Sequence, residues 1–211
     1  EKQTIQISCD ELLEQAYEES PLNNFEKNKF KDLFLNRYPE FDIMFGEAAQ
    51  ETGIEKNLLA AISFQESQWD PRAQSNMGVR GMMMVTLETA ALVGVEKRLN
   101  PEQNIKGGAK YFAMLKEKNI VGETDADQLS TTLASYNLGP TNINKIANQI
   151  NSDVQTVTWP EIRDKLKVIK GSELNLVDRE SYSRGQQAID YVDRVKSYYQ
   201  LLSAHSCVAP K

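Results

Sequence analysis

Apolar residues recur at helical spacing along most of the chain, and no stretch alternates apolar and polar residues as a half-buried strand does. Start and stop signals divide this pattern into segments. It predicts a helix from a Ser8/Glu11 capping box to Ser20-Pro21, one around Phe30 that breaks before Pro39, one from Phe41 to near Gly53, and helices over 54–68 and 104–118. It also predicts a helix through Leu129 and Tyr136 closed by Gly139-Pro140, one capped by Thr141 and reaching Ile150, one opened by a Thr158/Glu161 capping box and ended by Gly171, and one over 185–202.

The expected fold class is therefore mainly α. Polar stretches at 119–128 and 171–184 look like surface loops, and the sequence has neither an internal repeat nor a low-complexity tract. We expect one principal domain over 41–211, preceded by a helical appendage over 1–40.

Composition and charge exclude several classes of protein. The chain is 40% hydrophobic and 26% charged, as ordinary globular proteins are. A net charge of −6 without a basic stripe argues against nucleic acid as a partner. No apolar run approaches the roughly 20 residues that span a bilayer. We expect a monomer.

Cysteine and histidine are scarce. Cys9 and Cys207 lie almost at opposite ends of the chain, and the sequence leaves two readings open: a disulfide formed in an oxidising compartment, or two unrelated thiols. His205 is the sole histidine, so neither a zinc site nor a Ser-His-Asp triad is expected. We expect no metal and no cofactor.

One carboxylate stands out because it lies on an apolar stripe. Leu59, Ile62, Glu66 and Trp69 follow helical spacing, which places Glu66 on the core-facing side near a helix end. Partial burial there and the negative end of the helix dipole both raise the pKa of a carboxyl, so Glu66 is a candidate general acid.

The alternative is that Glu66 caps its helix or pairs with Arg72 or Arg80, and periodicity alone does not decide. The motifs from Glu66 onward decide between these two readings. They are Glu66-Ser67, Asp70-Pro71, Ala73, Ser75, Gly78, Gly81, Met82 and Met83, followed downstream by Asn104-Ile105 with Gly107 and Tyr111, by Ser135-Tyr136-Asn137-Leu138-Gly139-Pro140, and by Tyr191-Val192.

This ordered set, over about 41–202, resembles the lysozyme-like catalytic domain of the lytic transglycosylases, which cleave bacterial peptidoglycan. The run GVRGMMM is most similar to the membrane-bound members of the F type. The chain departs from the family pattern at Met84 (Gln in the family), Ser135 (Ala) and Gln187 (Glu), while the acid is retained.

The resemblance implies a reaction that needs one carboxylate. Glu66 would protonate the oxygen between N-acetylmuramic acid and N-acetylglucosamine, and then take the proton of the muramyl C6 hydroxyl as that group attacks C1. The product is a 1,6-anhydromuramyl end. Glycoside hydrolysis usually needs a second carboxylate. The neighbouring Asp70 precedes Pro71 and is more readily explained as a turn residue.

The resemblance also implies substrate-binding residues, each with a structural alternative. Ser67 orients Glu66, caps the helix or faces solvent. Ser75 reaches the substrate or serves the turn before Asn76. They are joined by Met83, which lines the cleft or fills the core; Tyr136, which holds the acid or packs in the core; Asn137, which ties the loop or contacts sugar; and Tyr191, which is offset from its helix's apolar stripe.

The expected partner is the glycan strand of peptidoglycan, and the expected location is the periplasm or cell envelope. Association with other wall enzymes is left open. Two rival functions remain: a lysozyme-type hydrolase that retains Glu66 but delivers water, and an inactive glycan-binding module.

Overall fold

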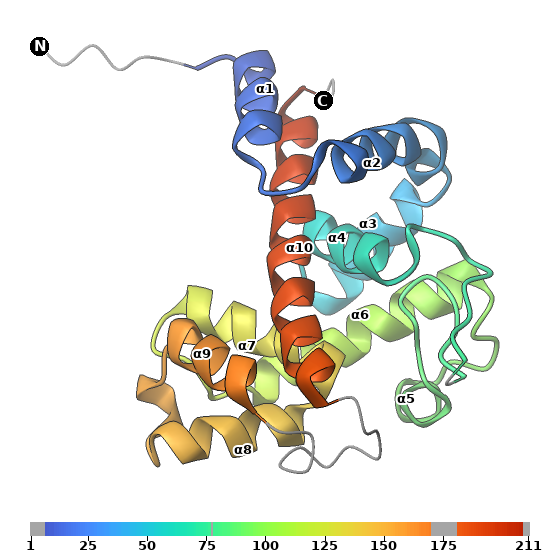
Figure 1. Ribbon diagram of the computed structural model, residues 1–211. Helices are drawn as coiled ribbons and strands as arrows, with labels where there is room; N and C mark the ends of the chain where they lie inside the picture. The colour runs from blue at the N-terminus through green and yellow to red at the C-terminus, as the bar shows by residue number, and fades with distance from the viewer. Residues whose placement is uncertain (1–6, 77, 170–180, 209–211) are drawn as a thin grey trace, which may run out of the picture. The chain divides into compact units, whose positions relative to one another are not determined.

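The computed structural model describes residues 7–76, 78–169 and 181–208, and these are mainly α-helical, as predicted. Two isolated antiparallel bridges, Gln74 with Arg80 and Arg80 with Val85, lie in the loop between α4 and α5. The helices shown in Figure 1 are α1 (Cys9–Glu19), α2 (Asn24–Asn36), α3 (Asp42–Thr52), α4 (Lys56–Ser67), α5 (Leu87–Val93), α6 (Pro101–Lys118), α7 (Asp125–Leu138), α8 (Pro140–Ile150), α9 (Trp159–Val168) and α10 (Ser181–Val208), with short 3₁₀ turns η1 (Tyr38–Glu40) and η2 (Val154–Thr156).

The local stop and start signals are confirmed where side chains bond to the adjacent backbone. The capping boxes at Ser8 and Thr158 both form. Helix α3 ends at Gly53, whose φ of 70° is in the left-handed region that glycine adopts readily.

Several predicted elements differ from the structure. Helix α7 begins at Asp125, inside the predicted 119–128 loop, and α6 begins at Pro101, before its predicted start at 104. Helix α8 begins at Pro140 with Gly139 as its N-cap, so Thr141 is not the cap; proline at the first helical position is pre-set for a helix. Helix α10 is longer than predicted at both ends. The short helix α5, capped by Thr86, was not predicted. Gly171 and most of the predicted 171–184 loop lie outside the described residues.

The chain forms two compact units, 1–109 with 194–211, and 110–193. We call them the first and second units. The division predicted at residue 40 stays a prediction, although α2 and η1 belong to the first unit together with α4. Among the described residues, no helix combines the length and apolarity needed to cross a membrane.

The core of the first unit is an aromatic cluster centred on Phe30 of α2, which is 0% exposed. Its ring centroid lies 5.0 Å from that of Phe64 on α4 and 5.5 Å from that of Tyr198 on α10. Trp69 is 5.8 Å away. Aromatic rings at such separations bury large apolar areas and pack favourably. Phe30 therefore anchors the N-terminal segment to the elements around the candidate acid.

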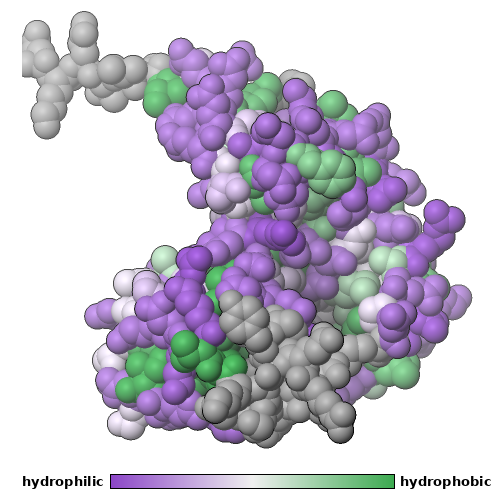
Figure 2. Space-filling model, viewed as in Figure 1, coloured by the Kyte–Doolittle hydropathy of each residue, from purple (hydrophilic) through white to green (hydrophobic). Residues whose placement is uncertain are grey.

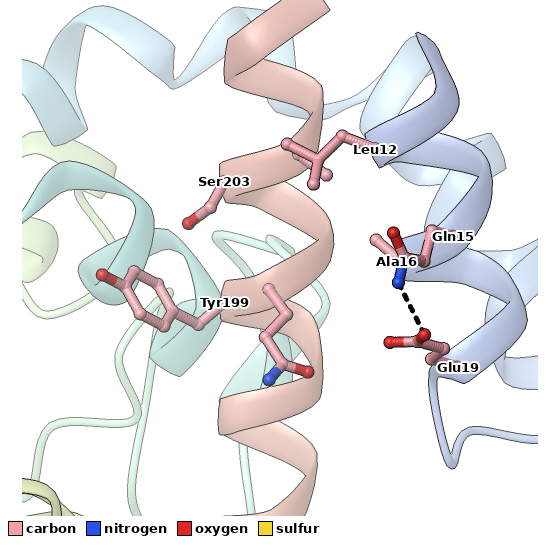
Figure 3. Close-up of a pocket in the computed structure, with 8 residues that line it drawn as sticks. Leu12, Gln15, Ala16, Glu19, Tyr199 and Ser203 are labelled. Atoms are coloured by element: carbon pink, nitrogen blue, oxygen red, sulfur yellow. Dashed lines mark hydrogen bonds between the residues drawn. The ribbon is translucent and has the colours of Figure 1, made fainter. Parts of the chain in front are cut away.

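Helix α1 is attached differently, because none of its residues is buried. It is rich in exposed acids, and Figure 2 shows a hydrophilic surface over it. Cys9 and Cys207 form a disulfide with their Cα atoms 5.4 Å apart, and Tyr17 Oη lies 2.9 Å from His205 Nε2 in a hydrogen bond. Between α1 and α10 lies a pocket of about 420 Å³, shown in Figure 3. Covalent and polar contacts thus replace core packing for α1.

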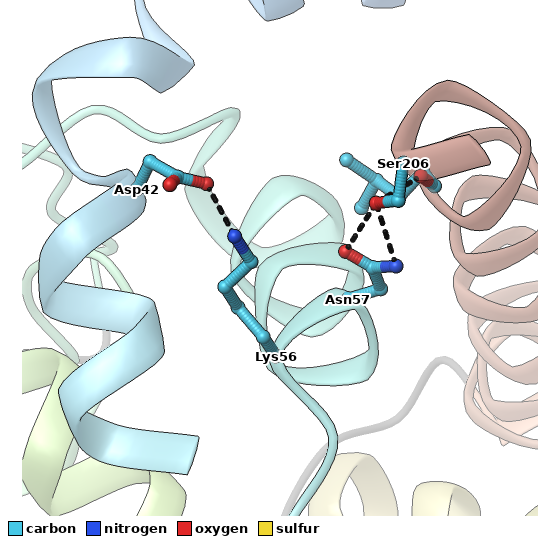
Figure 4. A network of polar contacts seen from close by, with 5 residues as sticks. Asp42, Lys56, Asn57 and Ser206 are labelled. Atoms are coloured by element: carbon cyan, nitrogen blue, oxygen red, sulfur yellow. Dashed lines mark hydrogen bonds and ion pairs between the residues drawn. The ribbon is translucent and has the colours of Figure 1, made fainter. Parts of the chain in front are cut away.

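Polar pairs fix the start of α4 against two other helices (Figure 4). Lys56 Nζ lies 2.8 Å from Asp42 Oδ1 on α3, and Asn57 Nδ2 donates to Ser206 Oγ on α10 at 3.0 Å. Burial acts to raise the pKa of Asp42, but the hydrogen bond from Lys56, the nearby Tyr38 hydroxyl and the Lys56 charge hold it below its usual value.

The second unit contains α7, α8 and α9, whose apolar faces pack together around Leu133, Ile143 and Ile162, all 0% exposed. Asp127 links two helix starts: its carboxylate completes the capping box of α7 and accepts a hydrogen bond from the backbone N–H of Trp159 at 2.7 Å.

Candidate functional site

Glu66 is the last residue but one of α4, and its side chain is half-buried. Leu59 and Ile62 of the predicted stripe are fully buried. The helix ends at Ser67, earlier than predicted, because Gln68 and Trp69 have φ values of 54° and 58° in the left-handed region. Glu66 therefore lies at the exposed edge of the apolar face, where the chain turns away.

Trp69 reaches the core by this turn and not along the helical face. Its Nε1–H donates to the carbonyl of Ala60 at 2.9 Å, and the side chain is 0% exposed. Non-glycine residues in the left-handed region are strained by about 1–2 kcal/mol each. Burial of the indole offsets that strain, so the buried Trp69 side chain stabilises the turn after Glu66.

Asp70 organises the next turn, as its position before Pro71 indicated. Its Oδ1 accepts a hydrogen bond from the backbone N–H of Arg72 at 2.9 Å. The Arg72 guanidinium, with a side chain 89% exposed, lies 3.9 Å from the same oxygen. This is the geometry of an Asx turn, which occupies one oxygen of the carboxylate nearest to Glu66 in sequence.

Two serines tie the loop after α4 back to the helix. Ser63 Oγ donates to the carbonyl of Met82 at 2.9 Å, and Ser67 Oγ lies 2.8 Å from the same oxygen and 3.1 Å from the carbonyl of Ser63. Because a hydroxyl carries one proton, Ser67 shares it between two acceptors. The Ser67 hydroxyl is thus directed at the backbone, which fixes the methionine segment against the turn that carries Glu66.

Asn104, at 0% exposure, forms hydrogen bonds with backbone groups of the same loop from its other side. Its Oδ1 accepts a hydrogen bond from the Met83 N–H at 2.7 Å. Its Nδ2 donates to the carbonyls of Arg80 at 2.9 Å and Arg98 at 2.7 Å. One buried carboxamide therefore provides partners for three backbone groups of the surrounding loops, which a buried backbone requires.

Close packing explains two glycines of this region. A Cβ at Gly81, where φ is +83°, would lie 2.3 Å from the Arg98 carbonyl oxygen. A Cβ at Gly108 would lie 2.4 Å from the Cβ of Met83. Met83 is 0% exposed, so its side chain packs in the core, which was its structural alternative; contact with substrate stays a prediction. Met84 is only half-buried, so of the three consecutive methionines it is the one whose side chain is partly exposed to solvent.

Ser75 lies in the turn of the same loop and is half-buried. Its N–H donates to the carbonyl of Val79 at 3.0 Å, and its Oγ accepts from the Val79 N–H at 3.3 Å. Gly78 N–H donates to the Ser75 carbonyl at 3.1 Å. These bonds give Ser75 the turn role that was its structural alternative; contact with substrate stays a prediction.

Residues of the N-terminal segment also support the site, and no motif points to them. Arg37 Nη1 donates to the carbonyl of Gln68 at 3.0 Å, and the Tyr38 ring centroid lies 4.8 Å from that of Trp69. These contacts span about thirty residues, and no local spacing signals them. They attach the segment before residue 41 to the turn that follows Glu66.

The remaining candidates lie in the second unit. Tyr136 is half-buried on α7, with its ring centroid 5.6 Å from that of Tyr111 and 6.1 Å from that of Phe112. Asn137 is half-buried, and Tyr191 on α10 is only 4% exposed. The described part of the chain holds no group of three or more His, Cys, Asp and Glu side chains that would fit a metal ion.

Comparison with known proteins gives consistent results. The family described as "Transglycosylase SLT domain" matches residues 43–156. "Membrane-bound lytic murein transglycosylase F 1" of Alkalilimnicola ehrlichii is 41% identical over 176 residues, which are 82% of this chain and 35% of that protein. "Membrane-bound lytic murein transglycosylase F" of Marinobacter nauticus is 36% identical over 184 residues, 86% of this chain and 36% of that protein. The chain thus spans about a third of the length of these curated relatives.

Two solved structures share the fold. The soluble lytic transglycosylase SLT70 of Escherichia coli has a TM-score of 0.59 at 15% identity, over 96% of this chain and 31% of that one. An inactive mutant of the lytic transglycosylase Slt of Pseudomonas aeruginosa has a TM-score of 0.57 at 18% identity, over 97% of this chain and 32% of that one.

Proposed function

Because this chain belongs to the transglycosylase SLT domain family, we propose that it is a peptidoglycan lytic transglycosylase with Glu66 as its single acid and base. The observation that carries the proposal is the placement of Glu66. It is half-buried in the last turn of α4, and the loop that follows is fixed by Ser63, Ser67 and Asn104. A carboxyl held this way can donate and retrieve a proton at a fixed position.

The proposed reaction uses that one carboxyl twice. Glu66 gives its proton to the glycosidic oxygen between N-acetylmuramic acid and N-acetylglucosamine, and the bond from C1 to that oxygen breaks. The muramyl C6 hydroxyl attacks C1 and passes its proton to the Glu66 carboxylate. The nucleophile belongs to the same sugar, so it has the effective-molarity advantage of a tethered group. The Asp70 turn supports this assignment, since it gives the neighbouring carboxylate another role.

The substrate-binding roles are proposed with unequal support. The hydrogen bonds of Ser67 support a positioning role for that residue. For Tyr136, Asn137 and Tyr191, and for Ser75 beyond its turn, contact with the glycan rests on the motif resemblance. The names of the curated relatives favour a location at the bacterial cell envelope.

Digestion of purified murein followed by mass spectrometry of the products tests the reaction. Lytic transglycosylase activity leaves 1,6-anhydromuramyl ends, which are lighter by one water than the reducing ends left by a hydrolase. Glu66→Gln should abolish cleavage, while Glu88→Gln, at an exposed position of α5, should not. Reducing-end products would establish the lysozyme-type hydrolase instead, and cleavage by Glu66→Gln at the wild-type rate would refute the role of Glu66.

A further inference from the structure

A polar pocket of about 290 Å³ lies in the first unit, on α2, the end of α4 and the C-terminal part of α10. Its lining includes Gln65 and Gln68, which flank the candidate acid in sequence. Successive helical residues point about 100° apart. The pocket therefore lies beside the turn that carries Glu66, on a different face of the helix end.

Hydrogen-bond donors without protein partners gather in this pocket. Tyr198 is only 5% exposed and lines it, yet no hydrogen bond is found for its hydroxyl among the described residues. The side-chain carboxamides of Gln65 and Gln68 likewise make no hydrogen bond within the described ranges. Because Tyr198, Gln65 and Gln68 all line the pocket, their polar groups can bond to a molecule bound there.

The charges around the pocket favour an anion. Glu26 is already engaged: it pairs with Arg194 at 3.1 Å and accepts a hydrogen bond from the Asn23 N–H at 3.0 Å. Lys29 Nζ lies 5.9 Å from the centroid of the Phe25 ring and has no carboxylate within salt-bridge distance in the described part of the chain. Two cations against one anion give this lining a positive balance, although the whole chain carries −6.

We propose that this pocket binds a carboxylate-bearing peptide segment, which in the proposed substrate is the acidic stem peptide of peptidoglycan; this assignment of the ligand rests on the proposed function. Lysine and arginine side chains donate hydrogen bonds but accept none, so a ligand that fits must supply acceptors. A carboxylate bonded by a cation and a hydroxyl forms the stronger, charge-assisted kind of hydrogen bond.

Size and composition favour a short peptide over a glycan chain. The volume is just below the roughly 300–1,000 Å³ range of small-molecule sites, so it can hold only a small part of a ligand. A carboxylate carries the negative charge that complements the Lys29 ammonium and the unused N–H groups of Arg194, whereas a sugar hydroxyl is neutral. A stem peptide bound here would hold its glycan strand near the end of α4 without touching Glu66.

The direct test is an NMR titration of the full chain with the tripeptide L-Ala-γ-D-Glu-meso-diaminopimelate. We expect saturable shifts at Gln65, Gln68 and Tyr198. Lys29→Gln and Tyr198→Phe should each weaken binding about tenfold, as expected for a lost hydrogen bond to a charged group. Lys27→Gln, two residues away on α2, is the matched control and should bind as the wild type does. Absence of saturable binding, or equal binding by Lys29→Gln and the wild type, overturns the proposal.

A kinetic test separates this proposal from the proposed function. Glycan strands with stem peptides are compared with strands from which an amidase has removed them. We expect Lys29→Gln to raise KM for the peptide-bearing strands and to leave kcat, and cleavage of the peptide-free strands, unchanged. An equal effect on both substrates contradicts the peptide site. If the wild type cleaves neither substrate, the proposed function fails, and the titration still decides whether the pocket binds the tripeptide.

Discussion

At the scale of single residues, the loop beside Glu66 depends most on Asn104, because its carboxamide bonds to Met83, Arg80 and Arg98 at once. Asn104→Ala removes all three hydrogen bonds at once, although the Arg80 carbonyl keeps the one that it accepts from the Val85 N–H at 3.0 Å. Unsatisfied buried groups cost about 1–3 kcal/mol each. We expect the free energy of unfolding, measured by urea denaturation, to fall by roughly 3 kcal/mol, and murein cleavage to fall with it.

Asn148→Ala is the matched control, because Asn148 is exposed on α8 and its amide bonds only within that helix, to the Asn144 carbonyl. Such surface changes usually stay within about 0.5 kcal/mol. Equal stability of the two variants would mean that the carboxamide of Asn104 is not what holds the loop.

Alanine substitutions at Gly81 and Gly78 distinguish the cost of backbone strain from the cost of a steric clash. Both have φ near +80°, at +83° and +78°. A Cβ at Gly81 would lie 2.3 Å from a carbonyl oxygen, whereas a Cβ at Gly78 meets nothing within 4 Å. Alanine at Gly78 should therefore cost only the left-handed strain of about 1–2 kcal/mol. Alanine at Gly81 should cost a further 1–3 kcal/mol or so from the clash, measured by the same denaturation.

The resemblance to the family motifs identified several of these residues but not what they do. Asn104, Gly81 and Ser67 all belong to the quoted motifs. Several partners of Ser67 and Asn104 are backbone atoms 15 to 24 residues away. Helical periodicity reports which side chains share a face, and it carries no information on such contacts between a helix and a loop. Met83 shows the same limit: its identity fitted the motif, while only packing shows that it is buried.

At the scale of elements, α1, α2 and α10 meet at His205. Its ring stacks on Phe34 with centroids 4.1 Å apart and bonds to Tyr17. Burial, and next the charge of Lys31, lowers the pKa of His205. The unfolded chain, whose histidine pKa is about 6.5, then takes up the proton first as the pH falls.

The stability contributed by neutral His205 is therefore present above about pH 6.5 and lost as the pH falls below it. We expect the free energy of unfolding of the wild type minus that of His205→Phe to be smaller at pH 5 than at pH 7.5, because only the wild type loses stability as histidine titrates. Urea denaturation at both pH values measures this difference. Phenylalanine keeps the stacking on Phe34 but does not titrate. A difference that is unchanged or larger at pH 5 would show that His205 does not titrate as its surroundings indicate.

Elements with local signals were predictable and those without were not. Capping boxes and the Gly53 stop lie within a few residues of the boundaries that they set. Helix α5 has only seven residues and exposes Leu87 and Leu92, so it shows no apolar face. The end of α4 was also misplaced, because Trp69 continues the helical spacing while its backbone turns left-handed to bury the indole.

At the scale of the whole molecule, the N-terminal segment makes the contacts that sequence could least reveal. Phe30 and Tyr38 pack on Phe64 and Trp69, and Arg37 bonds to Gln68. The motifs of the family begin after this segment, so the resemblance gave no reason to connect it with the site. A mainly α fold followed from periodicity, whereas the packing partners of α2 depend on tertiary structure.

Truncation tests the predicted division at residue 40. A chain that begins at residue 41 lacks Phe30, and loss of a buried phenylalanine ring alone typically costs about 3–5 kcal/mol. That is a large part of the roughly 5–15 kcal/mol that stabilises a native protein. We expect this chain to lose its cooperative thermal transition and its near-ultraviolet circular dichroism. A chain that begins at residue 21, with Cys207→Ser, loses α1 with its disulfide and the Tyr17 bond to His205 but keeps the aromatic cluster around Phe30, so it should keep both. If the chain from residue 41 instead melts cooperatively within a few degrees of the full chain, residues 41–211 are an independent domain and the segment before them is an appendage.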